Sequence, residues 1–130
     1  MFVQSPAALN LLEGVKVLDL SQYIPGPYAS KKMLELGAQV IKVEPPSGDP
    51  MRRFGGQNGE LSPLYIELNR GKQIVELDLK TDSGIEPFKT LLREADVLIE
   101  GFRPGTLKRL GFSMETLHRL NPRLVICSLS

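Results

Sequence analysis

The feature that most restricts the fold of this chain is a strand–turn–helix–strand pattern near its N-terminus. The run VKVLDL (15–20) is apolar and strand-like, and the turn SQYIPGPYASK (21–31) follows it directly. Pro27 is expected at the first helical position, where its missing N–H costs nothing, and Gly37 is expected to end the helix. QVIKVE (39–44) is then the second strand. Such a βαβ unit requires parallel pairing and a right-handed crossover.

Further apolar runs extend the same pattern toward the C-terminus. Strands are expected over 73–80, 96–100 and 123–130, with helical segments between them. Apolar strands alternating with helices indicate an α/β fold, here a Rossmann-like, open, mostly parallel sheet with flanking helices. A length of 130 residues suffices for one domain with a single core. In such sheets ligands bind at the carboxyl ends of the strands.

Polar residues predict where two of these helices begin. Ser83 and Glu86 have the spacing of a capping box, and Pro87 is expected within the first turn, where no helical N–H is lost. Ser113 is expected to cap a later, short helix. Its apolar face is expected to carry Met114, Leu117 and Leu120.

Residues 45–71 hold much of the chain's proline, glycine and asparagine and show little periodicity. We interpret them as a long loop, and loops of that length inside a compact domain are usually functional or mobile. Three segments that each follow a strand are therefore candidate site segments: 21–27, 45–53 and 101–109.

The composition narrows the class of protein. A hydrophobic fraction of 42% and a charged fraction of 24% are ordinary for a globular protein. The formal charge of +1 argues against a protein that coats nucleic acid or an acidic membrane. The single cysteine, Cys127, lies in an apolar run and is interpreted as a small buried residue. One cysteine cannot form an internal disulfide, which favours a reducing, cytoplasmic setting. No run is long enough to span a bilayer, and no signal-peptide pattern is present.

Glu44 ends the second strand where dinucleotide-binding folds place a ribose-binding acid. The turn IPGPYA, however, offers one glycine, and Pro25 and Pro27 remove two backbone donors that a pyrophosphate would need. We therefore interpret Glu44 as a solvated charge at a strand end.

Basic side chains in or near the strand-end loops suggest a second kind of site, for an extended anionic ligand. They are Lys42, Arg52, Arg53, Arg70, Lys72, Arg103, Lys108 and Arg109. Arginine suits phosphate through its paired donors, and Phe102 in GFRPG could stack on a planar base. The alternative, which the pattern alone favours, is a solvated basic surface with a core phenylalanine.

Catalytic machinery is not visible in the sequence. His118, the only histidine, is expected on the exposed side of a helix, so neither a zinc site nor a Ser-His-Asp arrangement is indicated, and no metal is expected. Asp19 is interpreted as ordering the neighbouring turn. From the residues alone, we interpret the chain as an α/β domain, with an anionic, nucleotide-like ligand as the candidate function.

Five motifs, in this order, resemble the N-terminal segment of the CoA-transferase family III, which includes formyl-CoA transferase and the α-methylacyl-CoA racemases. They are LEGVKVLDLSQYIPGP, LGAQVIKVEPPSGDPMR, LNRGKQIVELDLK, ADVLIEGFRPGTLKRLGF and LNPRLVICSLS. Together they cover nearly the whole chain.

The resemblance implies a Rossmann-like large domain that binds coenzyme A as substrate, in a cytoplasmic homodimer whose subunits interlock. Ile24 and Pro25 would border the coenzyme and the active site. The segment Leu77, Asp78, Leu79 and Lys80 would contact the ligand through its backbone. Gly101, Phe102 and Arg103 would hold the adenine end, and Arg109 would meet phosphate or nucleotide polar groups. The substrates implied are an acyl-CoA and a carboxylic acid, with no nucleic-acid or membrane partner.

Two departures from the family pattern put contacts in doubt. Some members carry a basic residue where this chain has Pro45, and many have asparagine where it has Gly101. The family nucleophile, an aspartate that forms acyl intermediates, would lie further along than Ser130. We therefore expect residues 1–130 to be a truncated, coenzyme-binding N-terminal part of the large domain, inactive alone.

Two alternatives stay open at this stage. An α-methylacyl-CoA racemase would exchange an α-proton with an acid/base pair, which would also lie beyond Ser130. A non-catalytic module that binds coenzyme A or a nucleotide would fold cooperatively and bind at this length. A chain left with an exposed edge after LVICSLS would instead tend to self-associate.

Overall fold

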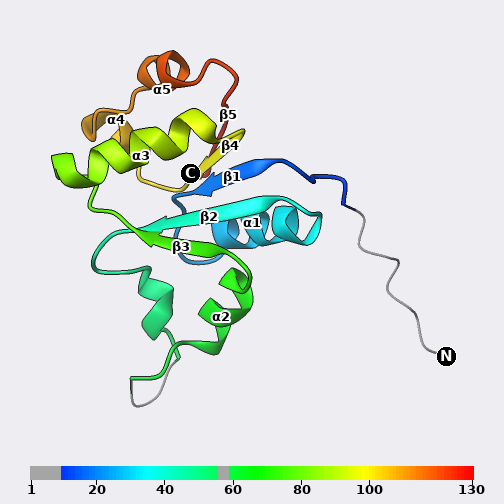
Figure 1. Cartoon of the computed structure of the whole chain (residues 1–130). Helices are drawn as coiled ribbons and strands as arrows, with labels where there is room; N and C mark the ends of the chain where they lie inside the picture. The colour runs from blue at the N-terminus through cyan, green and yellow to red at the C-terminus, as the bar shows by residue number, and fades with distance from the viewer. Residues whose placement is uncertain (1–9, 56–58) are drawn as a thin grey trace.

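The computed structural model describes residues 10–55 and 59–130, which contain a five-stranded sheet in the order β3-β2-β1-β4-β5 (Figure 1). The strands are β1 (Lys16–Asp19), β2 (Gln39–Glu44), β3 (Gln73–Glu76), β4 (Val97–Glu100) and β5 (Val125–Ser128). Every neighbouring pair is parallel. The predicted open parallel sheet of an α/β fold is therefore confirmed.

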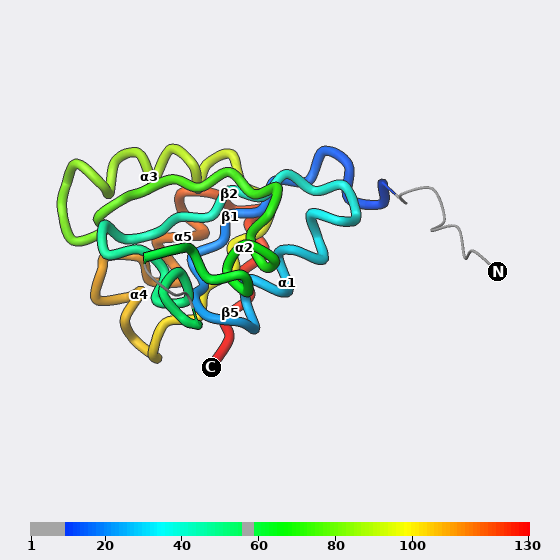
Figure 2. The backbone as a smooth tube through the Cα atoms, turned by 90° about the horizontal axis from the view of Figure 1, so that it is seen from below, coloured from blue at the N-terminus to red at the C-terminus, as the bar shows by residue number. Residues whose placement is uncertain are grey.

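Helices cover both faces of the sheet. They are α1 (Pro25–Glu35), α2 (Pro63–Asn69), α3 (Asp82–Glu94), α4 (Thr106–Arg109) and α5 (Met114–Leu120). Figure 2 shows α1 and α3 on opposite sides of the strands. The chain runs outward from β1 to β3 and then returns to the other side of β1 with β4. The strand order reverses between β1 and β4, and a crevice at such a reversal is where open α/β sheets bind ligands.

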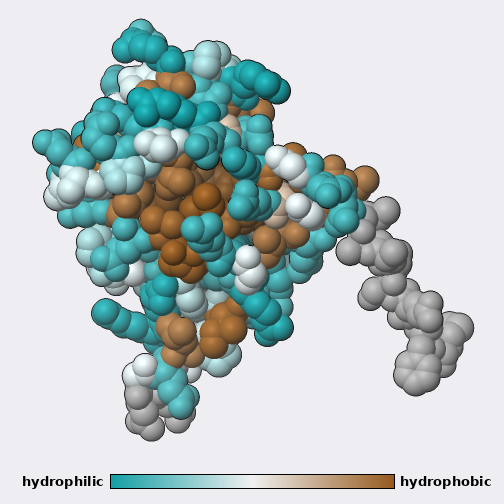
Figure 3. Space-filling view, viewed as in Figure 1, coloured by the Kyte–Doolittle hydropathy of each residue, from teal (hydrophilic) through white to brown (hydrophobic). Residues whose placement is uncertain are grey.

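Two apolar clusters hold these layers together. On the α3 side, Leu18 and Leu98 pack with Phe88, whose ring meets that of Phe112 edge-on at 4.9 Å between centroids. On the α1 side, Val17, Val40 and Ile99 form a smaller cluster with partly buried residues of α1. Figure 3 shows further apolar side chains gathered beside α3, over β2 and β3. None of the helices formed by residues 10–55 and 59–130 has the length and apolar character to cross a membrane.

Two boundaries differ from the sequence-based expectation. Helix α1 begins at Pro25, and the bond from Tyr28 N–H to Ile24 O (2.8 Å) closes its first turn, so both prolines lie where the helix needs no N–H. Strand β3 ends at Glu76, not at residue 80. The alternation of apolar residues continues beyond Glu76, but the backbone leaves the sheet there.

The segment 45–71 is more ordered than its sequence suggests, which corrects the expectation of a long loop. It contains a 3₁₀ helix, η1 (Pro50–Arg53), in which Asp49 accepts the N–H of Met51 at 2.9 Å. Helix α2 follows, with Ser62 as its N-cap. Residues 56–58 lie outside the described part. Each helix is too short to show a period, and each is started by a cap.

The cap of α3 is Thr81 and not Ser83, so the predicted capping box is wrong. Gly84 N–H donates to Thr81 Oγ1 at 3.3 Å, and the helix has already begun at Asp82. Pro87 consequently lies inside the helix, beyond the first turn where it was expected. The predicted cap of α5 is confirmed, since Thr116 N–H donates to Ser113 Oγ at 3.1 Å.

Two apolar residues expected in the core are exposed. Met114 is 50% exposed, whereas Leu117 on the same helix is fully buried. Cys127 is also exposed. It lies on β5, an edge strand, and on the side opposite Ile126, which packs against the larger cluster. An apolar run therefore does not guarantee burial when it forms the edge of a sheet.

Substitution of the two apolar residues of α5 separates a core position from a surface one. We expect Leu117→Ala to lower the free energy of unfolding by roughly 2–5 kcal/mol, because it leaves a cavity in a closed core. Met114→Ala should change it by less than about 0.5 kcal/mol. Urea unfolding followed by far-UV circular dichroism measures both, and equal losses would contradict the assigned helix face.

Candidate functional site

A small apolar cavity of about 160 Å³ opens at the carboxyl ends of the strands. Its lining comes from the ends of β1 and β2, from the segments that follow β3 and β4, and from α4: Leu20, Gln22, Val43, Pro45, Leu77, Asp78, Leu79, Lys80, Phe102, Thr106 and Leu110. It is smaller than the ~300–1,000 Å³ typical of sites for a whole drug-sized ligand. This cavity, which we call the first cavity, can therefore receive one part of a ligand, such as a flat ring system.

The segment 77–80 is held rigidly along this cavity. A Cβ atom on Gly84 would lie 2.0 Å from Asp78 O, so only glycine lets the first turn of α3 approach the segment this closely. Thr81 Oγ1 donates to Asp78 O at 2.9 Å, and Lys80 N–H donates to Asp78 Oδ1 at 3.0 Å. The backbone of 77–80 is thus presented in one conformation.

Phe102 stands between the first cavity and a larger one of about 620 Å³. Its N–H donates to Glu100 Oε2 at 3.0 Å, which fixes the backbone just after β4. Arg103 and Lys108 line the second cavity on the far side of Phe102, and both are exposed. Phe102 therefore lines both the small apolar cavity and a larger one that carries charges of both signs, from Arg103 and Lys108 and from Glu100 and Glu115.

A third cavity, of about 510 Å³, lies at the crevice between β1 and β4. It is lined by Ser21, Gln22, Tyr23, Pro25, Gly26, Gly101, Ser128, Leu129 and Ser130. Gly26 is required here because a Cβ atom would lie 2.0 Å from Ser21 Oγ. Gln22 lines both the first and the third cavity, so the two adjoin.

The start of α1 is poor in hydrogen-bond donors. Its first three residues are Pro25, Gly26 and Pro27, of which only the glycine has an N–H. A pyrophosphate cradled by a helix N-terminus needs several such groups. The turn thus walls the third cavity without offering a phosphate cradle, in line with the expectation from the sequence.

The structure brings most of the predicted site residues to this rim. The first cavity contains Leu77, Asp78, Leu79, Lys80 and Phe102. Pro25 and Gly101 line the third cavity, and Arg103 lines the second. Ile24 and Arg109 line none of the three. Ile24 is 46% exposed beside Pro25, and Arg109 donates to Thr106 Oγ1 at 2.9 Å, one hydrogen bond away from the first cavity.

Glu44 is not the solvated charge that we inferred from the sequence. It is buried, its Oε2 accepts from Arg52 Nε at 2.6 Å, and its Oε1 accepts from the hydroxyl of Tyr65 at 2.5 Å. Burial alone would raise the pKa of Glu44, but the bonds from Arg52, Tyr65 and the N–H of Asp49 outweigh it and lower that pKa. Glu44 therefore anchors the segment after β2, including α2, and is not a ligand group.

Two lysines expected to serve an anionic ligand are also committed elsewhere. Lys42 Nζ lies 3.0 Å from Asp49 Oδ2, Lys72 Nζ lies 3.3 Å from Asp19 Oδ2, and all four side chains are completely buried. Burial lowers the pKa of Lys72 to about 8. The predicted basic site thus loses Lys42 and Lys72, and Arg52 is paired with Glu44.

The role inferred for Asp19 is confirmed. Its Oδ1 accepts the N–H of Ser21 at 2.8 Å, and its carboxylate also accepts the hydroxyls of Ser21 and Ser30. His118 is exposed, as expected. Among residues 10–55 and 59–130, no group of three or more His, Cys, Asp or Glu side chains is placed to hold a metal ion.

Sequence reasoning missed the apolar walls of the first cavity. Val43 lies in β2 and Leu20 directly follows β1, whereas Thr106 begins the short α4 and Leu110 is its C-cap. The only signal in the sequence was their position at or just after predicted strand ends. Tyr65 was missed as well, because nothing in 45–71 indicated that α2 would return its hydroxyl to Glu44.

The fold and the rim define a parallel α/β protein with adjoining cavities at the carboxyl ends of its strands. Residues 12–130 match CoA-transferase family III, and the chain belongs to this family. The resemblance inferred from the five motifs is thereby confirmed.

Relatives and solved structures agree with this assignment. The chain is 42% identical over 119 residues to the acetyl-CoA:oxalate CoA-transferase of Acetobacter aceti, a match that covers 91% of this chain and 31% of the relative. It is 37% identical over 121 residues to the human succinyl-CoA:glutarate CoA-transferase, covering 92% and 28%. The crystal structure of a CaiB/BaiF family protein from Brucella suis superposes with a TM-score of 0.83 at 41% identity, over 91% of this chain and 32% of that one. The chain thus spans about a third of the length of its relatives.

Acid should destabilise the chain through Glu44. Because its pKa is lowered on folding, its stabilising contribution is complete above its ordinary value of 4.5 and is lost as the pH falls through the folded-state value. We expect the free energy of unfolding to fall less in Glu44→Gln than in the wild type between about pH 6 and pH 3. Tyr65→Phe removes one hydrogen-bond donor to Glu44, so its loss of stability over this pH range should be intermediate between those of the wild type and Glu44→Gln. Urea unfolding at several pH values in this range measures the pH dependence of the free energy of unfolding. The same pH dependence in Glu44→Gln and in the wild type would contradict the prediction.

Proposed function

We propose that this chain forms the coenzyme A-binding part of an acyl-CoA:carboxylate CoA-transferase. The single observation that carries the proposal is the first cavity, where 77–80 and Phe102 converge from different strands. A site with apolar walls, an aromatic ring and a rigid backbone segment suits a purine base, which needs stacking and a few backbone hydrogen bonds.

The remainder of the coenzyme has a route from this cavity toward the crevice between β1 and β4. The first and third cavities share Gln22, so a ligand whose base lies in the first can extend past Gln22 into the third. There the thioester end would lie against the turn that contains Ile24 and Pro25.

The phosphates of the coenzyme would remain at the surface. Arg103, Lys108 and Arg109 are exposed in the segment after β4 and on α4, and Arg103 and Lys108 line the second cavity together with Phe102. Exposed cations attract phosphate at modest gain, because water screens both partners. In this proposal the base supplies most of the affinity and the cations supply orientation.

The reaction proposed for the enzyme moves coenzyme A from an acyl-CoA to a free carboxylic acid, which leaves the donor's acid and a new thioester. Two relatives are named as such transferases, of oxalate and of glutarate, which favours transfer over the racemase alternative. The family's nucleophilic aspartate and its interlocked homodimer belong to the proposal and would complete the site around this rim. The chain's own residues bind and orient the coenzyme.

Removal of the aromatic ring tests the site of the base. We expect Phe102→Ala to weaken coenzyme A binding by roughly 5- to 150-fold, the range for the loss of one stacked base. Isothermal titration calorimetry with coenzyme A measures the affinity. Titration with adenosine 3′-phosphate 5′-diphosphate should show the same loss, whereas pantetheine binding should be unchanged.

Phe54→Ala is the matched control, because Phe54 is 67% exposed and lines none of the three cavities. It should bind coenzyme A as the wild type does. A wild-type protein that ignores coenzyme A overturns the proposed function, whereas equal affinities of Phe102→Ala and Phe54→Ala overturn only the placement of the base.

A further inference from the structure

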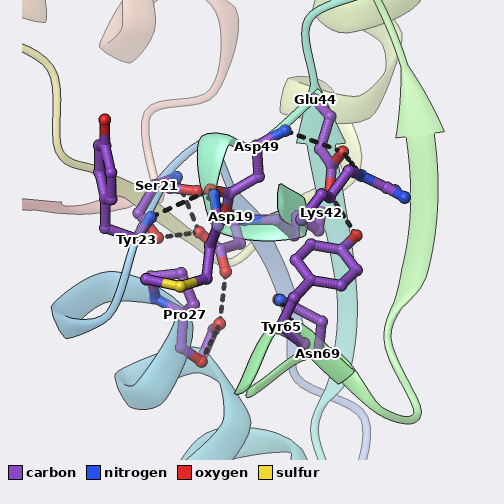
Figure 4. A network of polar contacts seen from close by, with 12 residues as sticks. Asp19, Ser21, Tyr23, Pro27, Lys42, Glu44, Asp49, Tyr65 and Asn69 are labelled. Carbon is purple, nitrogen blue, oxygen red and sulfur yellow. Dashed lines mark hydrogen bonds and ion pairs between the residues drawn. The ribbon is translucent and has the colours of Figure 1, made fainter. Parts of the chain in front are cut away.

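The turn after β1 is held by two buried ion pairs, Asp19 with Lys72 and Lys42 with Asp49. Figure 4 shows Asp19, Lys42 and Asp49 gathered around Ser21. Asp19 and Lys72 hold its two ends: Asp19 accepts the N–H of Ser21, and Lys72 Nζ donates to Pro27 O at 2.8 Å. Lys72 Nζ also donates a hydrogen bond to Asn69 Oδ1 at 2.9 Å. The second pair, Lys42 and Asp49, acts on the middle of the turn.

Lys42 and Asp49 bracket the turn with one donor and one acceptor. Lys42 Nζ donates to Ser21 O at 2.7 Å, and Asp49 Oδ1 accepts the N–H of Tyr23 at 3.2 Å. The same oxygen accepts the N–H of Met51, while Oδ2 faces Lys42 and takes part in no hydrogen bond. Two residues from β2 and from the segment after it thus set the path of the chain between Ser21 and Tyr23.

The conformation fixed in this way is an unfavourable one. Tyr23 has a φ of 63°, the left-handed region that residues other than glycine rarely adopt. Burial of the side chain does not offset this strain, because Tyr23 is 53% exposed and its ring points away from the network (Figure 4). The left-handed residue lies immediately before Ile24 and Pro25, at the wall of the third cavity.

A need for stability explains this pair poorly. Two charges lose their hydration when they are buried, and an apolar pair of similar volume is often as stable or more stable. What the charges supply, and an apolar pair would not, is a directed donor for Ser21 O and a directed acceptor for Tyr23 N–H.

We propose that Asp49 and Lys42 are positioning residues of the transferase, which fix the turn of residues 21–25 so that the thioester end of the acyl-CoA is held for reaction. This inference rests on the proposed function. Neither side chain touches the substrate, because both are completely buried. They act through the backbone of Ser21 and Tyr23.

Two substitutions of Asp49 in the complete protein separate positioning from stability. Asp49→Asn and Asp49→Ala both leave Lys42 without its carboxylate, so both destabilise, but only asparagine keeps an oxygen that can accept the N–H of Tyr23. We expect kcat of CoA transfer to fall by about tenfold to 100-fold in Asp49→Ala. Asp49→Asn should stay within about threefold of the wild type, and the Kd for coenzyme A should change by less than about twofold in both.

If either variant fails to fold, the same comparison is made with Lys42→Met added, which leaves no unpaired charge buried. Equal kcat values for the asparagine and alanine variants, or losses of kcat matched by losses of affinity, overturn the positioning role. Failure of both backgrounds to fold also overturns it, because the pair is then a requirement of folding. A wild-type protein that transfers no CoA refutes the proposed function before any variant is compared.

Discussion

The buried contact between Lys42 and Asp49 is the constraint on which the arrangement of the rim depends. Parallel strands deliver their carboxyl ends to one edge of the sheet, but they leave open how the segments beyond those ends are arranged. Lys42 reaches back 21 residues to Ser21, and Asp49 reaches back 26 residues to Tyr23. Glu44 extends the same linkage to Tyr65 on α2. One set of buried charges therefore joins the turn after β1 to the whole excursion between β2 and β3.

The sheet was predictable because it follows from local pattern. Short apolar runs separated by helical segments indicate parallel strands whatever their contacts, and the glycine after α1 marks its end. The sequence-based expectations were wrong where a local pattern continued although the three-dimensional surroundings of the chain changed. The alternation through Leu77 and Leu79 persists after the chain leaves the sheet, and the apolar run around Cys127 lies at a sheet edge. Thr81 and Ser83 stand two residues apart, so spacing to Glu86 favoured the wrong cap.

The site was less predictable than the fold, for a physical reason. A lysine in a strand or a glutamate at its end looks like a surface charge until its partner is known, and the partners here lie between 3 and 53 residues away. In the sequence, Lys42, Glu44 and Lys72 therefore look like exposed groups. The segment 77–80 came from the family resemblance, whereas the GFRPG pattern had already indicated Phe102, and the structure brings them into one cavity. Ile24 and Arg109 came from the same resemblance and lie just outside the cavities.

The Pro-Gly-Pro start of α1 has a consequence for turnover. A helix N-terminus with several free N–H groups binds an anion well. The first three residues of α1 offer only one N–H group, that of Gly26, because the other two are prolines. In the proposed CoA transfer, one thioester leaves and another forms, so an entrance that does not retain anions would favour turnover. The two prolines thus make the entrance to the crevice rigid and give it a low affinity for anions.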